Sequence, residues 1–465
     1  MSKKSGKLIV ILGALILISG AYYGSTIWAK KKGEKTEQSH TPSPRLGNLE
    51  SSDLVKMEFP DFTLEKKAEE WILISLNGKA PPGGLELDQS MINSLTWSLA
   101  SVWIDSVVNE EPEDLSVYGL DRPSARAAVT NSAGKEAVYL LGGVTPSRSS
   151  YYIMEEGDPK VYSVSAYSAA SINISVDIIR QRALFPAFQY PELGRFSMES
   201  HEATIKIEEK PASLRPYLAS AYASHILTSH YKLPRGVSSE ALSKLLAPFS
   251  GLKIDDFVDD SVADSPVSLQ PYGLDKPVKI SLRTAANSLD LLIGNAVEEK
   301  RYAKLAGAPG VFTISGMESV INVKPFDLAD KFILLVNIDF VDRIEINGGE
   351  KPLSADLQHK EGEETFFFNG EKAQTKAFKN FYESVIGLLA DAEYPAASVP
   401  QQPGAGSISI AHTLNNPPGE RVSITLIPYN RDFYAVRQEG TTEFLISRDQ
   451  VSKIYSRADA MVYEN

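Results

Sequence analysis

The sequence predicts an α+β fold: an N-terminal transmembrane helix followed by two or three tandem repeats of a strand-rich unit, in which one main helix packs on a sheet. Three observations lead to this prediction. They are an internal duplication, a similar apolar helix stripe that returns in each repeat, and a long uncharged run near the N-terminus. A chain of 465 residues is also too long for one core and suits about three domains.

The duplication is clearest in a hexapeptide that occurs twice. Its copies are Tyr118-Gly119-Leu120-Asp121-Arg122-Pro123 and Tyr272-Gly273-Leu274-Asp275-Lys276-Pro277. The Tyr-Gly-Leu part is predicted to end a short helical turn with glycine in the left-handed conformation and leucine packed inward. The residue before proline avoids the helical region, so the chain then extends into a strand. We interpret the hexapeptide as a structural hinge and not as a ligand site.

Other residues return in the same order, 150 positions later. The pairs are Ile104-Asp105 with Ile254-Asp255, Tyr152 with Tyr302, Pro159 with Pro309, Val161-Tyr162 with Val311-Phe312, and Asp177 with Asp327. They predict a first repeat at residues 53–190 and a second at 191–340.

A third, diverged repeat is predicted at residues 341–465. Tyr434 and Phe444 lie 132 positions beyond Tyr302 and Phe312. The segment Arg343-Ile344-Glu345-Ile346 also resembles Thr204-Ile205-Lys206-Ile207, although the hexapeptide is missing.

Each repeat has the same coarse order of elements. Residues 54–59, 62–66 and 70–76 alternate apolar and polar side chains, which is typical of half-buried strands. Asp88 is the expected N-cap of a helix that runs to Trp103. The apolar stripe of this helix is Ile92, Leu95, Leu99 and Val102. In the second repeat the expected cap is Ser238 or Ser239, and the stripe is Leu242, Leu245, Phe249 and Leu252. In the third repeat the helix starts at Thr375, and its stripe is Phe378, Phe381 or Tyr382, Val385 and Leu389. Further strands are expected at residues 106–109, 125–130, 136–141, 151–155 and 161–164.

Residues 8–28 contain no charged side chain and are long enough to cross a hydrocarbon core of about 30 Å. They are predicted to be a transmembrane signal anchor, with residues 1–7 as a cytoplasmic head and 29–52 as a flexible, solvated tether. The protein is then a single-pass membrane protein with most of its chain outside the cytoplasm. Three lysines precede this run and four follow it, so charge does not decide the orientation, which rests on the short head. A signal peptide cleaved after Ser19-Gly20-Ala21 is the alternative.

The charge distribution limits the partners. The net charge of −12 combines +6 in residues 1–35 with −18 in the rest of the chain. An acidic exterior repels nucleic acid and anionic lipid, so no nucleic acid partner is expected. Contact with the lipid bilayer is expected only through residues 8–28 and the lysines beside them.

The search for catalytic, cofactor-binding and metal-binding residues returns none. The histidines are His40, His201, His225, His230, His359 and His412, and none forms a His-Glu-x-x-His pattern. His225 and His230 are five residues apart, which places them on different faces of a helix. The densest carboxylate cluster is Asp255, Asp256, Asp259, Asp260 and Asp264. It lacks the glycine and distal glutamate of a calcium loop, so a solvated acidic loop is the preferred interpretation.

Residues around the hexapeptides match a known family pattern. In the first repeat these are Trp71, Leu140-Leu141-Gly142, Tyr151-Tyr152 and Val161-Tyr162; the second repeat has Leu291 to Gly294, Tyr302 and Val311 but no tryptophan. Over residues 55–325 the chain therefore resembles the bacterial DUF4340 family. The resemblance implies a membrane-anchored protein of unknown biochemistry, of a kind often encoded beside ABC exporters of the gliding-motility type. It assigns no catalytic residue.

These observations predict a protein that is not an enzyme. The expected function is a membrane-anchored extracytoplasmic accessory or scaffold protein of an ABC-type transport or envelope complex, with a membrane protein such as an ABC transporter subunit as its partner. One alternative is a module that binds envelope polysaccharide, because 20 tyrosines and 4 tryptophans could stack on sugars. Another is a hydrolase whose carboxylate pair comes together only in the fold.

Overall fold

The computed structural model describes residues 45–83, 85–214, 222–360, 363–395 and 402–464. The chain forms two compact units. Unit 1 comprises Met1–Pro81 with Glu86–Arg180, and unit 2 comprises Pro82–Leu85 with Gln181–Asn465. The predicted head, anchor and most of the tether lie outside the described residues. Within the described ranges, no helix is both long and apolar enough to span a membrane.

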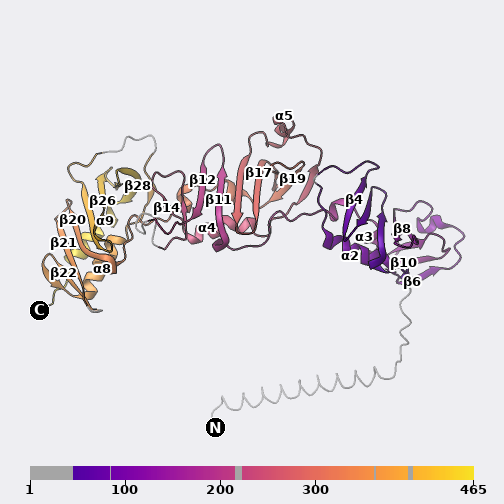
Figure 1. Ribbon diagram of the computed structural model, residues 1–465, viewed down its shortest axis with the longest axis horizontal. Coiled ribbons are helices and arrows are strands. Elements are labelled where there is room, and N and C mark those ends of the chain that lie inside the picture. The colour runs from indigo at the N-terminus through magenta and orange to yellow at the C-terminus, as the bar shows by residue number, and fades with distance from the viewer. Residues whose placement is uncertain (1–44, 84, 215–221, 361–362, 396–401, 465) are drawn as a thin grey trace, which may run out of the picture. The chain divides into compact units, whose positions relative to one another are not determined.

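Unit 1 contains an eight-stranded antiparallel sheet (Figure 1). In spatial order its strands are β4 (Glu70–Leu76), β3 (Phe62–Lys67), β2 (Leu54–Glu58), β7 (Ala125–Asn131), β8 (Glu136–Val144), β9 (Ser150–Glu155), β10 (Val161–Ser165) and β6 (Ser106–Asn109). A small sheet pairs β1 (Arg45–Leu46) with β5 (Val102–Trp103). The helices are η1 (Ser51–Asp53), α2 (Gln89–Ala100), η2 (Leu115–Tyr118), α3 (Ala166–Ile172) and η3 (Val176–Ile178).

Unit 2 begins with a nine-stranded antiparallel sheet, the second sheet. Its spatial order is β14 (Arg235–Gly236), β13 (His225–Leu227), β12 (Thr204–Glu209), β11 (Leu193–Glu199), β16 (Val278–Thr284), β17 (Ser288–Val297), β18 (Lys300–Leu305), β19 (Val311–Ser315) and β15 (Asp256–Asp259). Its helices are η4 (Tyr190–Glu192), α4 (Ser239–Leu246), η6 (Ala247–Phe249), α5 (Pro266–Leu269), η7 (Gln270–Tyr272), α6 (Glu318–Ile321) and α7 (Pro325–Leu328).

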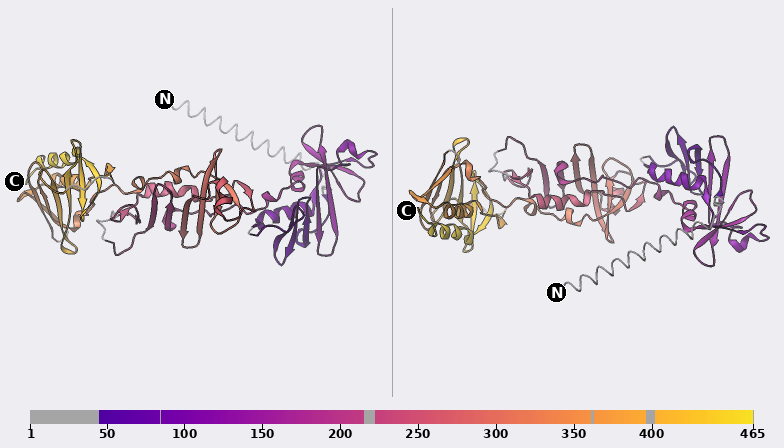
Figure 2. Two further views of the ribbon diagram at one scale, coloured as in Figure 1. Left: turned by 90° about the horizontal axis from the view of Figure 1, so that it is seen from above. Right: turned by 90° about the horizontal axis from the view of Figure 1, so that it is seen from below.

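Unit 2 ends with another nine-stranded sheet, the third sheet. Its order is β23 (Glu371–Ala373), β22 (Glu363–Phe368), β21 (Leu353–Lys360), β20 (Val341–Asn347), β25 (Ile408–Asn415), β26 (Pro418–Pro428), β27 (Phe433–Gln438), β28 (Thr441–Ser447) and β24 (Ala392–Glu393). Its helices are η8 (Ile338–Phe340), α8 (Thr375–Ile386) and α9 (Arg448–Asp459). Figure 2 shows α9, in yellow, along one side of these strands.

The three sheets share one strand order. In each, a first meander is followed by a helix, an edge strand and a four-stranded meander, and the first strand of the first meander pairs with the first strand of the second. The first meander has three strands in unit 1 and four in each sheet of unit 2. This order corrects one sequence alignment. The strand at Arg343–Ile346 occupies the place of β11, not that of Thr204–Ile207 in β12, because β20 pairs with β25 as β11 pairs with β16. Alternating apolar residues look alike on neighbouring strands, so the pattern alone misplaced this segment by one strand.

The α+β prediction is wrong, because the described chain is mostly β. Its residues form four antiparallel sheets, and the α-helices other than α2, α8 and α9 have eight residues or fewer. The predicted helices exist, and Asp88 and Ser238 cap α2 and α4 as expected. The prediction was wrong about how much of the chain is strand and how much is helix. A few short helices accompany each large sheet, while eight or nine hydrogen-bonded strands make up most of its residues.

The helix of the first repeat is shorter than predicted. It ends at Ala100, because Ser101 adopts an extended backbone (φ −153, ψ 90). Val102 and Trp103, which were expected in the helix, instead form β5 and pair with Leu46 and Arg45. The predicted stripe does pack inward, since Ile92, Leu95 and Leu99 are buried with β-strand residues in the core.

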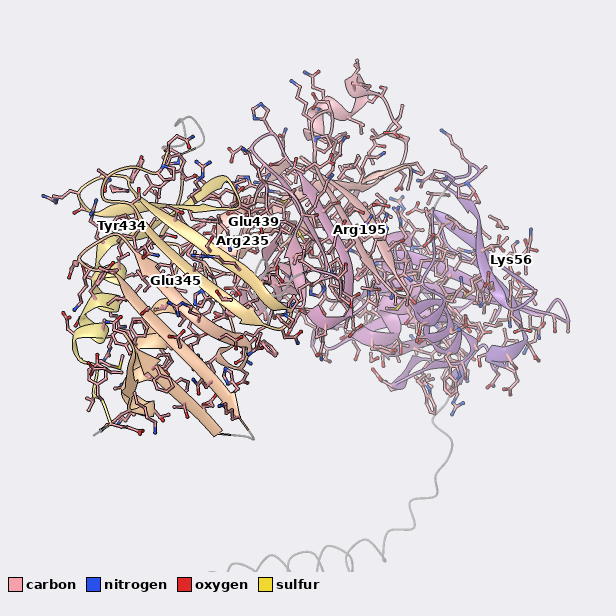
Figure 3. All side chains as sticks on the ribbon, turned by 60° about the vertical axis from the view of Figure 1, so that its left-hand side comes forward. Lys56, Arg195, Arg235, Glu345, Tyr434 and Glu439 are labelled. Carbon is pink, nitrogen blue, oxygen red and sulfur yellow. The ribbon has the colours of Figure 1, made fainter. Side chains whose placement is uncertain are left out.

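The faces of the sheets that point away from the core expose charged side chains in pairs. Figure 3 labels one such residue on the corresponding strand of each sheet: Lys56 on β2, Arg195 on β11 and Glu345 on β20. Arg195 lies 3.3 Å from Glu208, and Glu345 lies 3.1 Å from Arg421. These sheet faces are therefore solvated, as is common for antiparallel sheets with a single buried face.

Candidate functional site

The first hexapeptide closes a turn. Gly119 is in the left-handed region (φ 68) and ends η2, and Leu120 is buried at 4% exposure. The Tyr118 ring packs edge-on against Tyr152 at 5.1 Å, and its hydroxyl accepts a hydrogen bond from Asn109. Asp121 and Pro123 are exposed.

The second hexapeptide has the same geometry. Gly273 (φ 69) ends η7, Leu274 is buried, and Tyr272 packs edge-on against Tyr302 at 5.2 Å. Asp275 is exposed and Pro277 half-buried. In both copies the tyrosine carbonyl lies against a strand glycine: a Cβ on Gly142 would be 2.3 Å from the Tyr118 oxygen, and one on Gly294 would be 2.1 Å from the Tyr272 oxygen. The Leu-Leu-Gly and Leu291 to Gly294 strand ends thus make room for the turn.

The aspartate cluster is engaged in ion pairs and turns. Asp256 lies 2.6 Å from Lys300 and accepts a hydrogen bond from Thr313, and these contacts lower the pKa of its carboxyl. Asp264 lies 3.0 Å from the buried ammonium of Lys304, and Asp259 accepts hydrogen bonds from Ser261. Among the described residues, no group of three or more His, Asp or Glu side chains could hold a metal ion.

The histidines have separate environments. His225 is buried on β13, where its Nε2 lies 2.7 Å from the Leu193 carbonyl, and His230 lies in a turn with φ 73. These two residues are therefore not on a helix, which corrects the sequence interpretation. His412 on β25 is buried, and neither ring nitrogen has a hydrogen-bond partner among the described residues.

Unit 1 carries a groove between α2 and α3. Its volume is about 530 Å³, and three large rings line it: Trp97 of α2, Trp103 of β5 and Tyr167 of α3. Their exposed fractions are 73%, 47% and 74%. The guanidinium of Arg45 stacks 3.6 Å from the Trp103 ring and so covers part of one of its faces.

The other described residues of the groove are small and uncharged: Ser90, Asn93, Ser94, Ser98 and Ser168. The first four lie on the same face of α2 as Trp97, at helical spacing, opposite the buried stripe. The hydroxyls of Ser94 and Ser98 donate to the carbonyls one turn earlier, at 3.0 and 3.1 Å. Their oxygen lone pairs remain able to accept hydrogen bonds from a ligand.

The second repeat has a groove at the corresponding helices, with a different lining. It is formed by α4, α6 and α7 and contains Glu240, Lys244 and Asp327 but no aromatic ring among its described residues. The positions 150 residues after Trp97, Trp103 and Tyr167 hold Ala247, Lys253 and Met317. The fold therefore does not require aromatic residues at these positions.

This groove was not among the sites predicted from the sequence. Trp97 lies outside the apolar stripe of its helix, among serines and an asparagine. That placement was the available signal, because a large ring on the polar face of an amphipathic helix cannot pack in the helix's own core. The contribution of Tyr167 could not be found, since α2 and α3 are far apart in sequence.

Within unit 2, a second cluster joins the edges of the second and third sheets. The Tyr231 hydroxyl donates to Glu393 at 2.7 Å, and His230 lies 2.8 Å from the same carboxylate. Arg235, labelled in Figure 3, is buried with its guanidinium 4.4 Å from the Phe444 ring. Burial lowers the pKa of Arg235, and burial together with the hydrogen bond to Glu393 raises the pKa of Tyr231. The two sheets are thus held together by partly buried polar contacts.

Comparison with known proteins gives one family match. The model of a family described as "Domain of unknown function (DUF4340)" matches residues 80–277 and again residues 226–397. The first match begins before α2 and ends in the second hexapeptide, and the second runs from β13 to beyond β24. No curated protein and no solved structure matches the chain.

Proposed function

Because the chain belongs to the DUF4340 family, whose description names no activity, we propose from its architecture that it is an accessory or scaffold protein that holds a membrane partner. The observation that carries this proposal is what the repeats have in common. The three sheets share one strand order, and the two hexapeptides share a turn glycine, a buried leucine and a tyrosine pair. Shared packing residues maintain a repeated shape, and a repeated shape supplies several contact surfaces.

Two aspartates of the acidic cluster are engaged in contacts within the protein, which favours the scaffold proposal over a hydrolase. Asp256 and Asp264, the most conspicuous members of the acidic cluster, bind lysines of the same sheet, Lys300 and Lys304. The contacts of Asp256 with Lys300 and Thr313 lower the pKa of its carboxyl, which makes Asp256 poorly suited to act as a general acid.

The proposed location is the outer face of the cell membrane. The uncharged segment at residues 8–28 supplies the attachment to the membrane, and the polar residues after it link this segment to the sheets. We propose an ABC transporter subunit as the partner, on the basis of the family resemblance. Protease added to intact spheroplasts is expected to digest the sheets; full protection, while a known surface protein is degraded, would place them inside.

Affinity purification tests the partner. The full-length chain, purified from solubilised membranes under mild conditions, is expected to bring down one membrane protein in constant ratio, identified by mass spectrometry. A tagged unrelated single-pass protein is the control. Recovery of no membrane protein above that control, or saturable substrate turnover that disappears when one carboxylate is replaced in a folded variant, would contradict the proposal.

A further inference from the structure

We propose that the groove formed by Trp97, Trp103 and Tyr167 binds an unbranched, β-linked glycan. This site goes beyond the scaffold function and does not depend on it. It belongs to unit 1 alone, whereas the scaffold proposal rests on the repetition of the sheets.

The rings of this groove are exposed to solvent. An aromatic side chain gains much by burial, yet Trp97 and Tyr167 are about three-quarters exposed and line one groove with Trp103. Single exposed apolar residues are ordinary, but several around one concave surface mark a binding site. Trp97 and Tyr167 contribute little to the core, so their presence is better explained by a ligand.

The second repeat has no such rings in its corresponding groove. At the corresponding positions the chain has alanine, lysine and methionine, and the corresponding groove contains Glu240 and Lys244, which form an ion pair at 2.6 Å. The same fold is therefore built with and without the rings. The aromatic lining is a property of one repeat and points to a task that the other does not share.

The lining of the groove combines aromatic rings with small polar side chains. Its described residues are three rings and five serine or asparagine side chains, all uncharged. The guanidinium of Arg45 lies beside this lining, where it stacks on the Trp103 ring. A nucleic acid or an anionic lipid surface needs lysine and arginine, and the chain outside residues 1–35 is strongly acidic. A β-linked pyranose fits both parts of the lining. Its C–H faces are apolar and slightly positive and can lie on the electron-rich ring faces, while its equatorial hydroxyls reach Asn93, Ser94 and Ser98.

The experiment measures binding of two defined glycans to the full-length chain by isothermal titration calorimetry. The probes are the β-1,4-linked hexamers of N-acetylglucosamine and of glucose. Saturable binding of at least one hexamer is expected. Trp97→Ala and Tyr167→Ala are each expected to weaken it about tenfold or more, because aromatic anchors dominate such contacts. Both residues are largely exposed, so the unfolding midpoint of each variant should stay that of the wild type.

Two matched controls are available in unit 2. Lys244→Ala changes the corresponding groove, and Tyr222→Ala removes a tyrosine of 79% exposure elsewhere. Both should bind the hexamer like the wild type. The proposal would be overturned if neither hexamer bound at millimolar concentration, or if Trp97→Ala and the wild type bound equally well. If no hexamer binds, two results would assign the groove to another ligand and also overturn the proposal. One is binding of phosphatidylglycerol vesicles that Trp97→Ala abolishes, and the other is self-association of the chain through the groove.

Discussion

At the scale of single residues, the most unusual side chain is His412. It lies on the central strand β25, about 1% exposed, and its ring packs edge-on against Tyr382 at 6.3 Å. Because burial opposes its charged form, the pKa of His412 is lowered to about 4. The folded protein therefore keeps this imidazole neutral under conditions in which an unfolded chain would protonate it.

This burial predicts a pH-dependent stability. The pKa of His412 is about 4 in the fold and 6.5 in the reference state, so the unfolded chain binds more protons between these values and stability falls as the pH drops from about 6.5 to about 4. The loss from this residue is about 3 kcal/mol. Urea unfolding followed between pH 4 and 8 measures it, with His412→Met as the comparison. An equally steep pH dependence in His412→Met would show that other groups cause it.

The strand glycines give a second prediction at this scale. In Gly294→Ala, the new methyl would lie 2.1 Å from the Tyr272 carbonyl oxygen, and the hexapeptide turn would have to move. We expect a loss of about 1–3 kcal/mol in unfolding free energy. Gly83→Ala is the control, because nothing lies within 4 Å of that position and its φ is not in the left-handed region. Equal stability of the two variants in denaturant titrations would contradict the hinge interpretation.

At the scale of elements, the loop before α5 is joined to the second sheet by one buried charge. Lys304 of β18 is 1% exposed, and its ammonium lies 3.0 Å from Asp264. Asp264 itself is 64% exposed, so only the lysine side of this pair is buried. Removing Asp264 leaves a buried ammonium without its carboxylate, which is costlier than breaking a pair between two exposed side chains.

Asp264→Asn is therefore expected to destabilise the protein by about 1–3 kcal/mol. Asp256→Asn, which breaks the pair with the more exposed Lys300, should cost clearly less, because water screens that contact. Thermal unfolding of both variants at one ionic strength makes the comparison. If the two losses were equal, the buried position of Lys304 would not govern the strength of the contact.

At the scale of the whole molecule, unit 2 combines two repeats of the sequence. Tyr231 and Arg235 at one end of the second sheet contact Glu393 and Phe444 of the third. Deleting residues 341–465 would expose these side chains. A substitution at the junction is therefore a cleaner way to separate the two sheets than a truncation.

Glu393→Ala removes the acceptor shared by Tyr231 and His230. We expect faster amide hydrogen exchange in β13, β14 and β24, with a loss of about 1–2 kcal/mol in local stability and little change in the strands of unit 1. Exchange mass spectrometry of the full chain measures both. Glu371→Ala, at an exposed position of β23, is the control. Unchanged exchange at β13 and β14 would mean that the junction does not stabilise these edges.

The sequence by itself determined the repeat, the turn glycines, the helix caps at Asp88 and Ser238, and nearly all strands of the first repeat, because these follow from short-range patterns and backbone preferences. Only the tertiary structure decided the proportion of sheet, the end of α2 before Trp103, and the place of Arg343–Ile346 in the third sheet. It also brought Trp97 and Tyr167 to one groove and Tyr231 to Glu393. Contacts of this kind join residues far apart in the chain, so they depend on which strands and helices become neighbours, and local periodicity does not contain that information.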